Sequence, residues 1–229
     1  MASAALGRLE TLLQTRKLDG TVSRSWRDSL AFPSASSGNS EVDRQLGGGW
    51  RRGEVSEVIG PRGSGRTSLL VSTLAAATAR DEVVAIIDAV DRFDPVSAAL
   101  AGVDLDRVLW VRGASIGVES ARPSVVEHAV HQAVRALDLV VRAGGFGVVA
   151  LDLADLPPRA VRALPFATWL RVAHVLEGRD TACLLIGEGQ IGRSPKGATV
   201  QLSGEQIWTG TSPQARRFTG IKPLVHKSC

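Results

Sequence analysis

The sequence contains no tyrosine, one methionine and only two cysteines, and it has no apolar run of membrane-spanning length. Two cysteines do not make the disulfide framework of a small secreted domain. Cys183 lies inside an apolar stretch, so we expect reduced thiols and a cytoplasmic location. The first residues also lack the basic-then-apolar pattern of a signal peptide. These absences argue against the membrane and secreted classes.

Residue patterns for metal sites and base stacking are also lacking. The five tryptophans are scattered, so no aromatic platform for stacking bases is predicted. His128 and His131 share a face of an expected helix, but no cysteine or carboxylate cluster completes a metal site around them. No paired-cysteine zinc pattern and no Ser-His-Asp arrangement is visible.

The most informative stretch that is present is a glycine-rich turn between an apolar strand, expected at 55–59, and a helix that begins near Arg66. The spacing of Gly60, Gly65 and Thr67 fits the phosphate-binding loop G-x-x-x-x-G-K-[ST] at every position but one. Glycines let backbone N–H groups converge on a phosphate, and the following helix points its positive end there. We therefore predict that the nucleotide-binding residues are Gly60, Pro61, Arg62, Gly63, Ser64, Gly65, Arg66, Thr67 and Ser68.

The exception in this loop is Arg66, which stands where the motif has lysine. A lysine ammonium is compact and reaches between phosphates, whereas a guanidinium is broad and planar, so the exchange is not conservative. The motif places the Thr67 hydroxyl on a magnesium ion. Asp152 follows an apolar run and is expected to hold that Mg²⁺ through water, the alternative being a cap of the next turn.

Strands and helices alternate along the chain, which predicts an α/β fold with a mostly parallel twisted sheet covered by helices on both faces. A closing antiparallel hairpin is expected from 198–202 and 206–209, with its turn at 203–205. A short helix is expected to begin with Ser40 as N-cap and to stop at Gly47. The other expected strands cover 83–88, 108–111, 148–151 and 182–186, and the other helices cover 67–79, 94–101, 123–142 and 157–176, the last interrupted by Pro165.

Three parts of the chain are expected: an N-terminal helix and linker over 1–40, a core domain over 41–210, and a basic, less ordered tail over 211–229. Leu6, Leu9 and Leu13 fall on one side of an amphipathic N-terminal helix, which packs either on its own domain or on a partner. Basic residues dominate from 193 onward, as expected for nucleic-acid contact, a solvated face or an acidic partner. The DNA-binding candidates are Arg193, Lys196, Arg216 and Arg217.

Taken together, three segments resemble the RecA recombinase core in the same order and at similar separations: GEVSEVIGPRGSGRTSLL, AIIDAVDRFDPVSAALAGVDLDRVLWVRG and GVVALDLADLPP. The resemblance runs from about 53 to 210. The preceding WRDSL and GGGWRRG are similar to the ImuA group of RecA-like accessory factors in bacterial mutagenic translesion synthesis. That resemblance implies ATP and Mg²⁺ as cofactors, a place near the nucleoid, and as partners an ImuB-like Y-family polymerase homologue, an error-prone polymerase, RecA itself and DNA.

The departures from the RecA pattern concentrate on chemistry. Val90 stands where the family has the glutamate that activates water, which leaves Asp91 and Glu188 as candidate catalytic carboxylates beside Asp88 and Asp94. Asp94 matches an aspartate near the adenine, but Ser97 replaces the stacking tyrosine. Glu188 replaces the glutamine that senses the γ-phosphate. The sequence therefore predicts an adaptor with a degenerate nucleotide site. The alternative is a weak DNA-stimulated ATPase.

Overall fold

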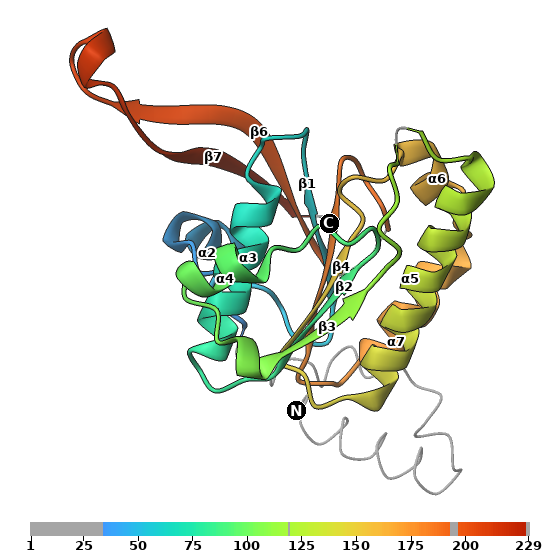
Figure 1. The fold of residues 1–229 in the computed structure, drawn as a ribbon. Coiled ribbons are helices and arrows are strands. Elements are labelled where there is room, and N and C mark those ends of the chain that lie inside the picture. The colour runs from blue at the N-terminus through green and yellow to red at the C-terminus, as the bar shows by residue number, and fades with distance from the viewer. Residues whose placement is uncertain (1–33, 119, 193–196, 228–229) are drawn as a thin grey trace, which may run out of the picture. The chain divides into compact units, whose positions relative to one another are not determined.

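A computed structural model describes residues 34–118, 120–192 and 197–227 of the chain. In these ranges a seven-stranded sheet has the order β3-β2-β4-β5-β1-β6-β7 (Figure 1). Neighbouring strands from β3 to β6 pair in parallel, and β7 pairs antiparallel with β6. The strands are β1 Val55–Ile59, β2 Val84–Asp88, β3 Val108–Arg112, β4 Val148–Asp152, β5 Ala182–Gly187, β6 Ala198–Thr209 and β7 Arg217–Lys227.

Helices cover both faces of this sheet, which confirms the predicted fold class. One apolar cluster joins the sheet to α5, α6 and α7, and a second joins it to α2, α3 and α4. The central strands contribute to both, since Cys183 and Leu185 of β5 face one cluster and Leu184 faces the other. The helices are α2 Ser40–Leu46, α3 Arg66–Thr78, α4 Pro95–Leu100, α5 Pro123–Ala143, α6 Pro158–Arg162 and α7 Phe166–Leu176, with 3₁₀ turns η1 Leu105–Arg107 and η2 Pro213–Ala215.

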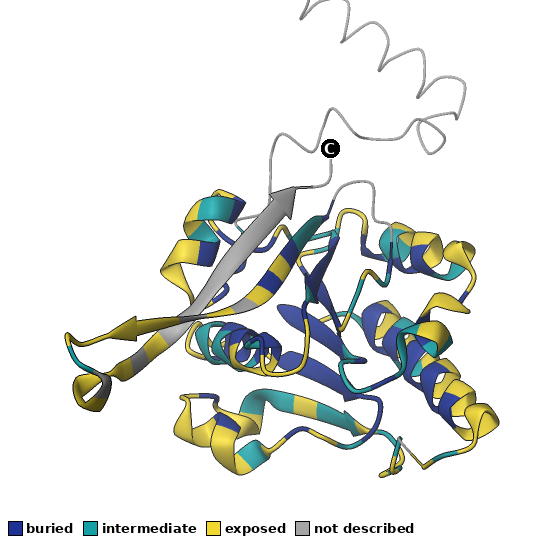
Figure 2. Ribbon diagram, turned by 90° about the horizontal axis from the view of Figure 1, so that it is seen from above, coloured by how far each residue is buried: buried dark blue, intermediate teal, exposed yellow. Residues whose placement is uncertain are grey.

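Continuous apolar runs explain why β2, β4 and β5 form the centre. A strand of a parallel sheet that is buried on both faces cannot alternate apolar with polar residues. All five residues of β2 and all six of β5 are buried. Figure 2 shows these strands as the buried interior, with exposed residues gathered on the outer helices and the hairpin. None of the helices within the described ranges is long and apolar enough to cross a bilayer.

The expected position of the C-terminal hairpin is wrong. β6 runs without a turn through 203–205, where two extra residues shift its register against β7, since Leu202 pairs with Pro223 and Gln206 with Ile221. The turn lies instead at 210–216, and the segment expected to be less ordered supplies β7 (Figure 1). A serine-glycine pair in a long strand marks a bulge here rather than a reversal. Pro223 fits an edge strand, where a missing N–H costs little.

The start of α2 also differs from the expectation by one residue. Asn39, not Ser40, is the N-cap, and its Oδ1 accepts hydrogen bonds from the N–H groups of Glu41 and Val42, both at 3.1 Å. Gly47 ends the helix in the left-handed conformation with φ 80°, as predicted. The break at Pro165 is confirmed, because α6 ends at Arg162 and α7 begins at Phe166.

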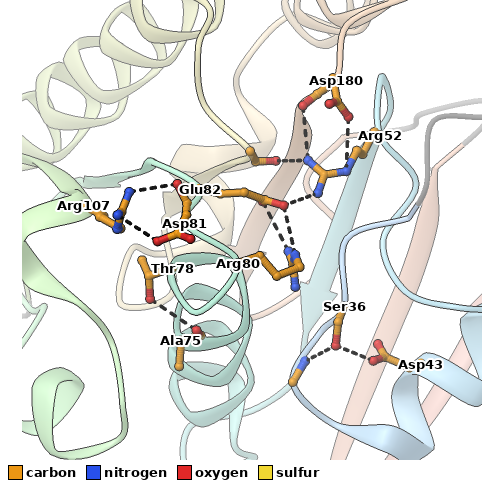
Figure 3. A network of polar contacts seen from close by, with 12 residues as sticks. Ser36, Asp43, Arg52, Ala75, Thr78, Arg80, Asp81, Glu82, Arg107 and Asp180 are labelled. Carbon is orange, nitrogen blue, oxygen red and sulfur yellow. Dashed lines mark hydrogen bonds and ion pairs between the residues drawn. The ribbon is translucent and has the colours of Figure 1, made fainter.

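An arginine network fastens the amino ends of the strands (Figure 3). The Arg52 guanidinium, whose side chain is 6% exposed, contacts Glu82 at 2.6 Å and Asp180 at 3.3 Å and donates to the Gly147 carbonyl at 3.3 Å. These partners precede β2, β5 and β4. Every N–H group of a buried guanidinium needs an acceptor, and the network supplies several. Ligands of a parallel sheet bind beyond the opposite, carboxyl edge, which this network leaves free.

Candidate nucleotide-binding site

The glycine-rich loop connects β1 to α3 at the carboxyl edge. Gly65 stands at the N-cap of α3 with φ 94°, and no side chain caps the helix, so its first N–H groups face the loop. Gly60 is required sterically, because a Cβ there would come within 2.4 Å of the Leu202 carbonyl oxygen and 2.6 Å of Ser64 Oγ. The loop therefore has the strand–turn–helix setting that a phosphate cradle requires.

A pocket of about 340 Å³ opens over this loop. Of the loop residues predicted to bind nucleotide, Arg62, Gly63 and Gly65–Ser68 line it, while Gly60, Pro61 and Ser64 belong to the same turn but are not part of the lining. The pocket also brings in residues from the loops after β2 and β4. Its complete lining is Arg62, Gly63, Gly65, Arg66, Thr67, Ser68, Leu70, Asp88, Val90, Arg92, Phe93, Asp152, Ala154 and Asp155.

Two carboxylates that line the pocket end neighbouring strands. Asp88 and Asp152 are register partners in β2 and β4. Asp88 accepts a hydrogen bond from the Phe93 N–H at 2.7 Å, and Asp152 accepts one from the Ala154 N–H at 2.9 Å. Burial, together with the negative charges of Asp88 and Asp155, raises the pKa of Asp152 to about 6, against the opposing effects of the Ala154 N–H and Arg66.

Arg66 lies inside this pocket rather than on the protein surface. Its side chain is buried at 6% exposure, and Nη1 donates to the Ala154 carbonyl oxygen at 3.3 Å. Ala154 is also the residue whose N–H binds Asp152. The guanidinium thus lies at the end of β4, close enough to lower the pKa of Asp152 by its charge.

The position of the expected water activator is apolar. Val90 is 2% exposed and lines the pocket. The next residue, Asp91, has φ 61° and is held by Arg112 through two contacts of 2.9 Å, and this hydrogen-bonded pairing lowers the pKa of Asp91. The Arg112 guanidinium also stacks 4.5 Å from the centre of the Trp110 ring. Asp91 is absent from the pocket lining.

Two further acidic residues from the sequence analysis also stay outside the pocket lining. Glu188 is exposed just beyond β5. Asp94 caps α4, where its carboxylate accepts hydrogen bonds from the Val96 N–H and the Ser97 hydroxyl. Of the four carboxylates considered for hydrolysis, only Asp88 therefore reaches the pocket.

Sequence reasoning missed the part that the loops after β2 and β4 play in this pocket. Arg92 and Asp155 line it and form an ion pair with Nε to Oδ2 at 3.7 Å, and Phe93 lies beside them. The only signal in the sequence is that Asp88 and Asp152 each follow an apolar strand, and the pairing of β2 with β4 is what brings the residues after them to the same edge. The roles expected for the loop between β2 and α4 came from the resemblance to RecA, which did not point to Arg92 or Phe93.

The nucleic-acid and partner candidates lie away from this pocket or outside the described residues. Arg216 and Arg217 are exposed, at the hairpin turn and the start of β7. Arg193 and Lys196, like Leu6, Leu9 and Leu13, lie outside the described residues. The segment that leads to Arg193 is held by Glu57 of β1, whose buried carboxylate accepts hydrogen bonds from the Ile191 and Gly192 N–H groups.

The two helical histidines do not assemble with other ligands in the described part of the chain. His128 and His131 are exposed on α5, and His128 Nε2 lies 3.4 Å from the Gln132 amide nitrogen. Across residues 34–118, 120–192 and 197–227, no three histidine, cysteine or carboxylate side chains group closely enough to hold a metal ion by themselves.

Comparison with known proteins agrees with this geometry. A family model described as the RecA N-terminal domain matches residues 20–162. Protein RecA of Corynebacterium aurimucosum is 35% identical over 127 residues, which is 55% of this chain and 30% of the relative. Protein RecA of Synechococcus sp. strain WH7803 is 36% identical over 126 residues, which is 55% of this chain and 29% of the relative. The alignments thus cover less than a third of these relatives, while the family model covers more than half of this chain. The chain belongs to the RecA N-terminal domain family.

Proposed function

We propose that this chain is a RecA-derived adaptor in bacterial DNA repair, of the ImuA type that serves SOS-induced translesion synthesis. It acts in the cytoplasm, near the nucleoid. Its partners are an ImuB-like Y-family polymerase homologue, an error-prone polymerase and RecA, and its nucleotide site binds ATP with little turnover. The family membership supports the general role, and the motifs of residues 26–53 support the narrower one.

One observation carries the adaptor proposal. The pocket keeps the loop that binds phosphate, but buried Val90 occupies the place where a carboxylate would activate water. Asp91 is held by Arg112, and Glu188 lies outside the pocket lining. General base catalysis contributes on the order of a hundredfold or more, so its loss leaves a site better suited to binding than to hydrolysis.

Exposed apolar side chains support a role in protein contacts. Val96 and Leu100 of α4 are 67% and 86% exposed, and Leu109 of β3, a strand at the sheet edge, is 42% exposed. Apolar side chains that gather on a surface mark protein-binding sites, and an unpaired strand edge offers backbone groups to a partner. From their helical spacing, Leu6, Leu9 and Leu13, which lie outside the described residues, are expected to form a further apolar surface.

The proposal predicts that the full chain co-purifies with the ImuB-like polymerase homologue through these leucines. Replacing Leu6, Leu9 and Leu13 together with alanine should weaken the measured partner affinity by about tenfold or more, because anchoring apolar side chains carry most interface energy. Val96→Ser with Leu100→Ser tests the exposed apolar residues of α4 in the same assay. Leu139→Ala, at a 69% exposed site on α5, serves as control and should bind normally. Full affinity in both the triple and the double variant would refute the adaptor role.

A weak DNA-stimulated ATPase is the second candidate. The observation in its favour is that Arg62, Arg66 and Arg92 line a pocket that also holds Thr67 and Asp152. Three cations can stabilise charge on a transferring phosphoryl group even without a dedicated base. Measured phosphate release separates this candidate from the adaptor.

A further inference from the structure

Arg66 occupies a position that bears on the metal requirement of the site. Its guanidinium is almost fully buried, lines the pocket, and hydrogen-bonds the carbonyl of Ala154, two residues beyond Asp152. In proteins with this loop motif, the hydroxyl at the position of Thr67 binds the Mg²⁺ ion. A strand-end aspartate, here Asp152, also holds that ion. A fixed positive charge of the chain thus lies beside the carboxylate that the motif reserves for a metal.

The residues present do not fit a divalent cation well. Two like charges that share a partly buried pocket repel each other more strongly than they would in water, because the protein screens them less. A lysine in this position would be a flexible point charge, but the planar guanidinium is anchored to Ala154. Asp152 also already accepts the Ala154 N–H, and no other described histidine, cysteine or carboxylate groups with it into a three-ligand site.

The same features fit a phosphate chain. A guanidinium presents five N–H donors in a fork that matches phosphate oxygens. Among the described residues, the Arg66 guanidinium donates a hydrogen bond to the Ala154 carbonyl oxygen. Arg62 from the loop and Arg92 from the segment after β2 line the same pocket, Arg92 in its ion pair with Asp155, so three guanidinium groups share this space with the carboxylates of Asp88, Asp152 and Asp155. The backbone N–H groups at the start of α3 add donors that need no metal.

We infer that the Arg66 guanidinium takes the charge-neutralising role of Mg²⁺, so that the pocket binds a nucleoside di- or triphosphate without a divalent cation. The inference rests on the proposed nucleotide binding and deepens it. The replacement of the motif lysine by Arg66 then changes which positive charge neutralises the phosphates, and nucleotide binding is kept. Thr67 contributes its backbone N–H to the phosphate, and its hydroxyl becomes dispensable.

The test measures the dissociation constant of a fluorescent ATP analogue by anisotropy, in excess Mg²⁺ and in excess EDTA. The wild-type constant should change by less than about threefold between the two buffers, and Thr67→Ala should change it little in either. Arg66→Lys, which removes the anchored fork, should bind at least about tenfold more weakly in EDTA than in Mg²⁺. Arg171→Lys, on an exposed site of α7, is the matched control.

The outcomes distinguish a failure of metal-independent binding from a failure of the proposed nucleotide site. Wild-type binding that weakens tenfold or more in EDTA overturns the inference and leaves the nucleotide site of the proposed function intact. The absence of binding in both buffers, with a normal thermal midpoint, overturns the nucleotide site itself. If Arg66→Lys binds the ATP analogue equally well in both buffers, groups other than Arg66 make binding independent of metal, and the inference about Arg66 is overturned.

Discussion

Replacing Asp152 with asparagine is expected to stabilise the protein at neutral pH by about 2 kcal/mol. The pKa of this carboxyl is raised from 3.8 to about 6, mainly by burial, so the folded state holds the proton more tightly than the unfolded state does. Stability is then lost as the pH rises from about 4 to about 6 and stays lower above that window. The full pKa shift corresponds to about 3 kcal/mol of stability. Because Asp152 is partly exposed to water in the pocket, the expected gain is smaller than that.

The measurement is the free energy of unfolding by urea at pH 7.5 and pH 4 for both proteins. The gain of Asp152→Asn should be present at pH 7.5 and much smaller at pH 4, where the raised pKa of Asp152 keeps the carboxyl of the folded wild type protonated. Asp106→Asn, at an exposed site on η1, is the matched control and should change stability little at either pH. A loss of stability at pH 7.5 in the Asp152 variant would show that the ionised carboxylate is well compensated in the fold.

Replacing Glu57 with alanine is expected to destabilise the fold by about 3 kcal/mol and to weaken binding to single-stranded DNA. Glu57 is 2% exposed on β1, and its carboxylate accepts the N–H groups of Ile191 and Gly192. Removing the acceptor leaves the buried Gly192 N–H and the part-buried Ile191 N–H unpaired, at a cost of about 1–3 kcal/mol for a fully buried donor and less for the other. The segment so released leads to Arg193, a DNA-binding candidate, and ordering it on DNA would then cost conformational entropy.

Glu57→Gln is the informative comparison, because the glutamine carbonyl still accepts both N–H groups without a charge. Burial raises the pKa of Glu57, so removing its charge should offset part of any loss, and this variant should stay within about 1 kcal/mol of wild type. Urea unfolding and DNA binding by anisotropy measure the two effects. An alanine variant as stable as the glutamine variant would mean that the two N–H groups find other acceptors.

Much of this fold was predictable because its signals are local. The runs that became β2, β4 and β5 are continuously apolar and short, as is typical of a strand buried on both faces. The spacing from Gly60 to Thr67 placed a loop between strand and helix, and Pro165 marked a helix break. Each of these features depends on a few neighbouring residues.

The features that sequence reasoning missed depend on which distant segments pair. The residues 203–205 look like a turn until β7 is known to be the partner of β6. Asp91 looks like a neighbouring substitute for the lost glutamate until its left-handed backbone and its pairing with Arg112, 21 residues later in the chain, are known. The Arg92–Asp155 pair likewise requires that β2 and β4 be adjacent.

Phosphate release from ATP, with and without single-stranded DNA, is the most direct test of the central claim that this RecA-family chain binds nucleotide without turning it over. The measurement uses the purified full chain in excess Mg²⁺ beside Asp152→Ala, so that a contaminating ATPase appears equally in both. The account predicts no release above the variant in either condition, because Val90 stands where the family has its water-activating glutamate, and Asp88, the one candidate carboxylate that lines the pocket, already accepts the Phe93 N–H. Release that DNA stimulates and Asp152→Ala abolishes would contradict it.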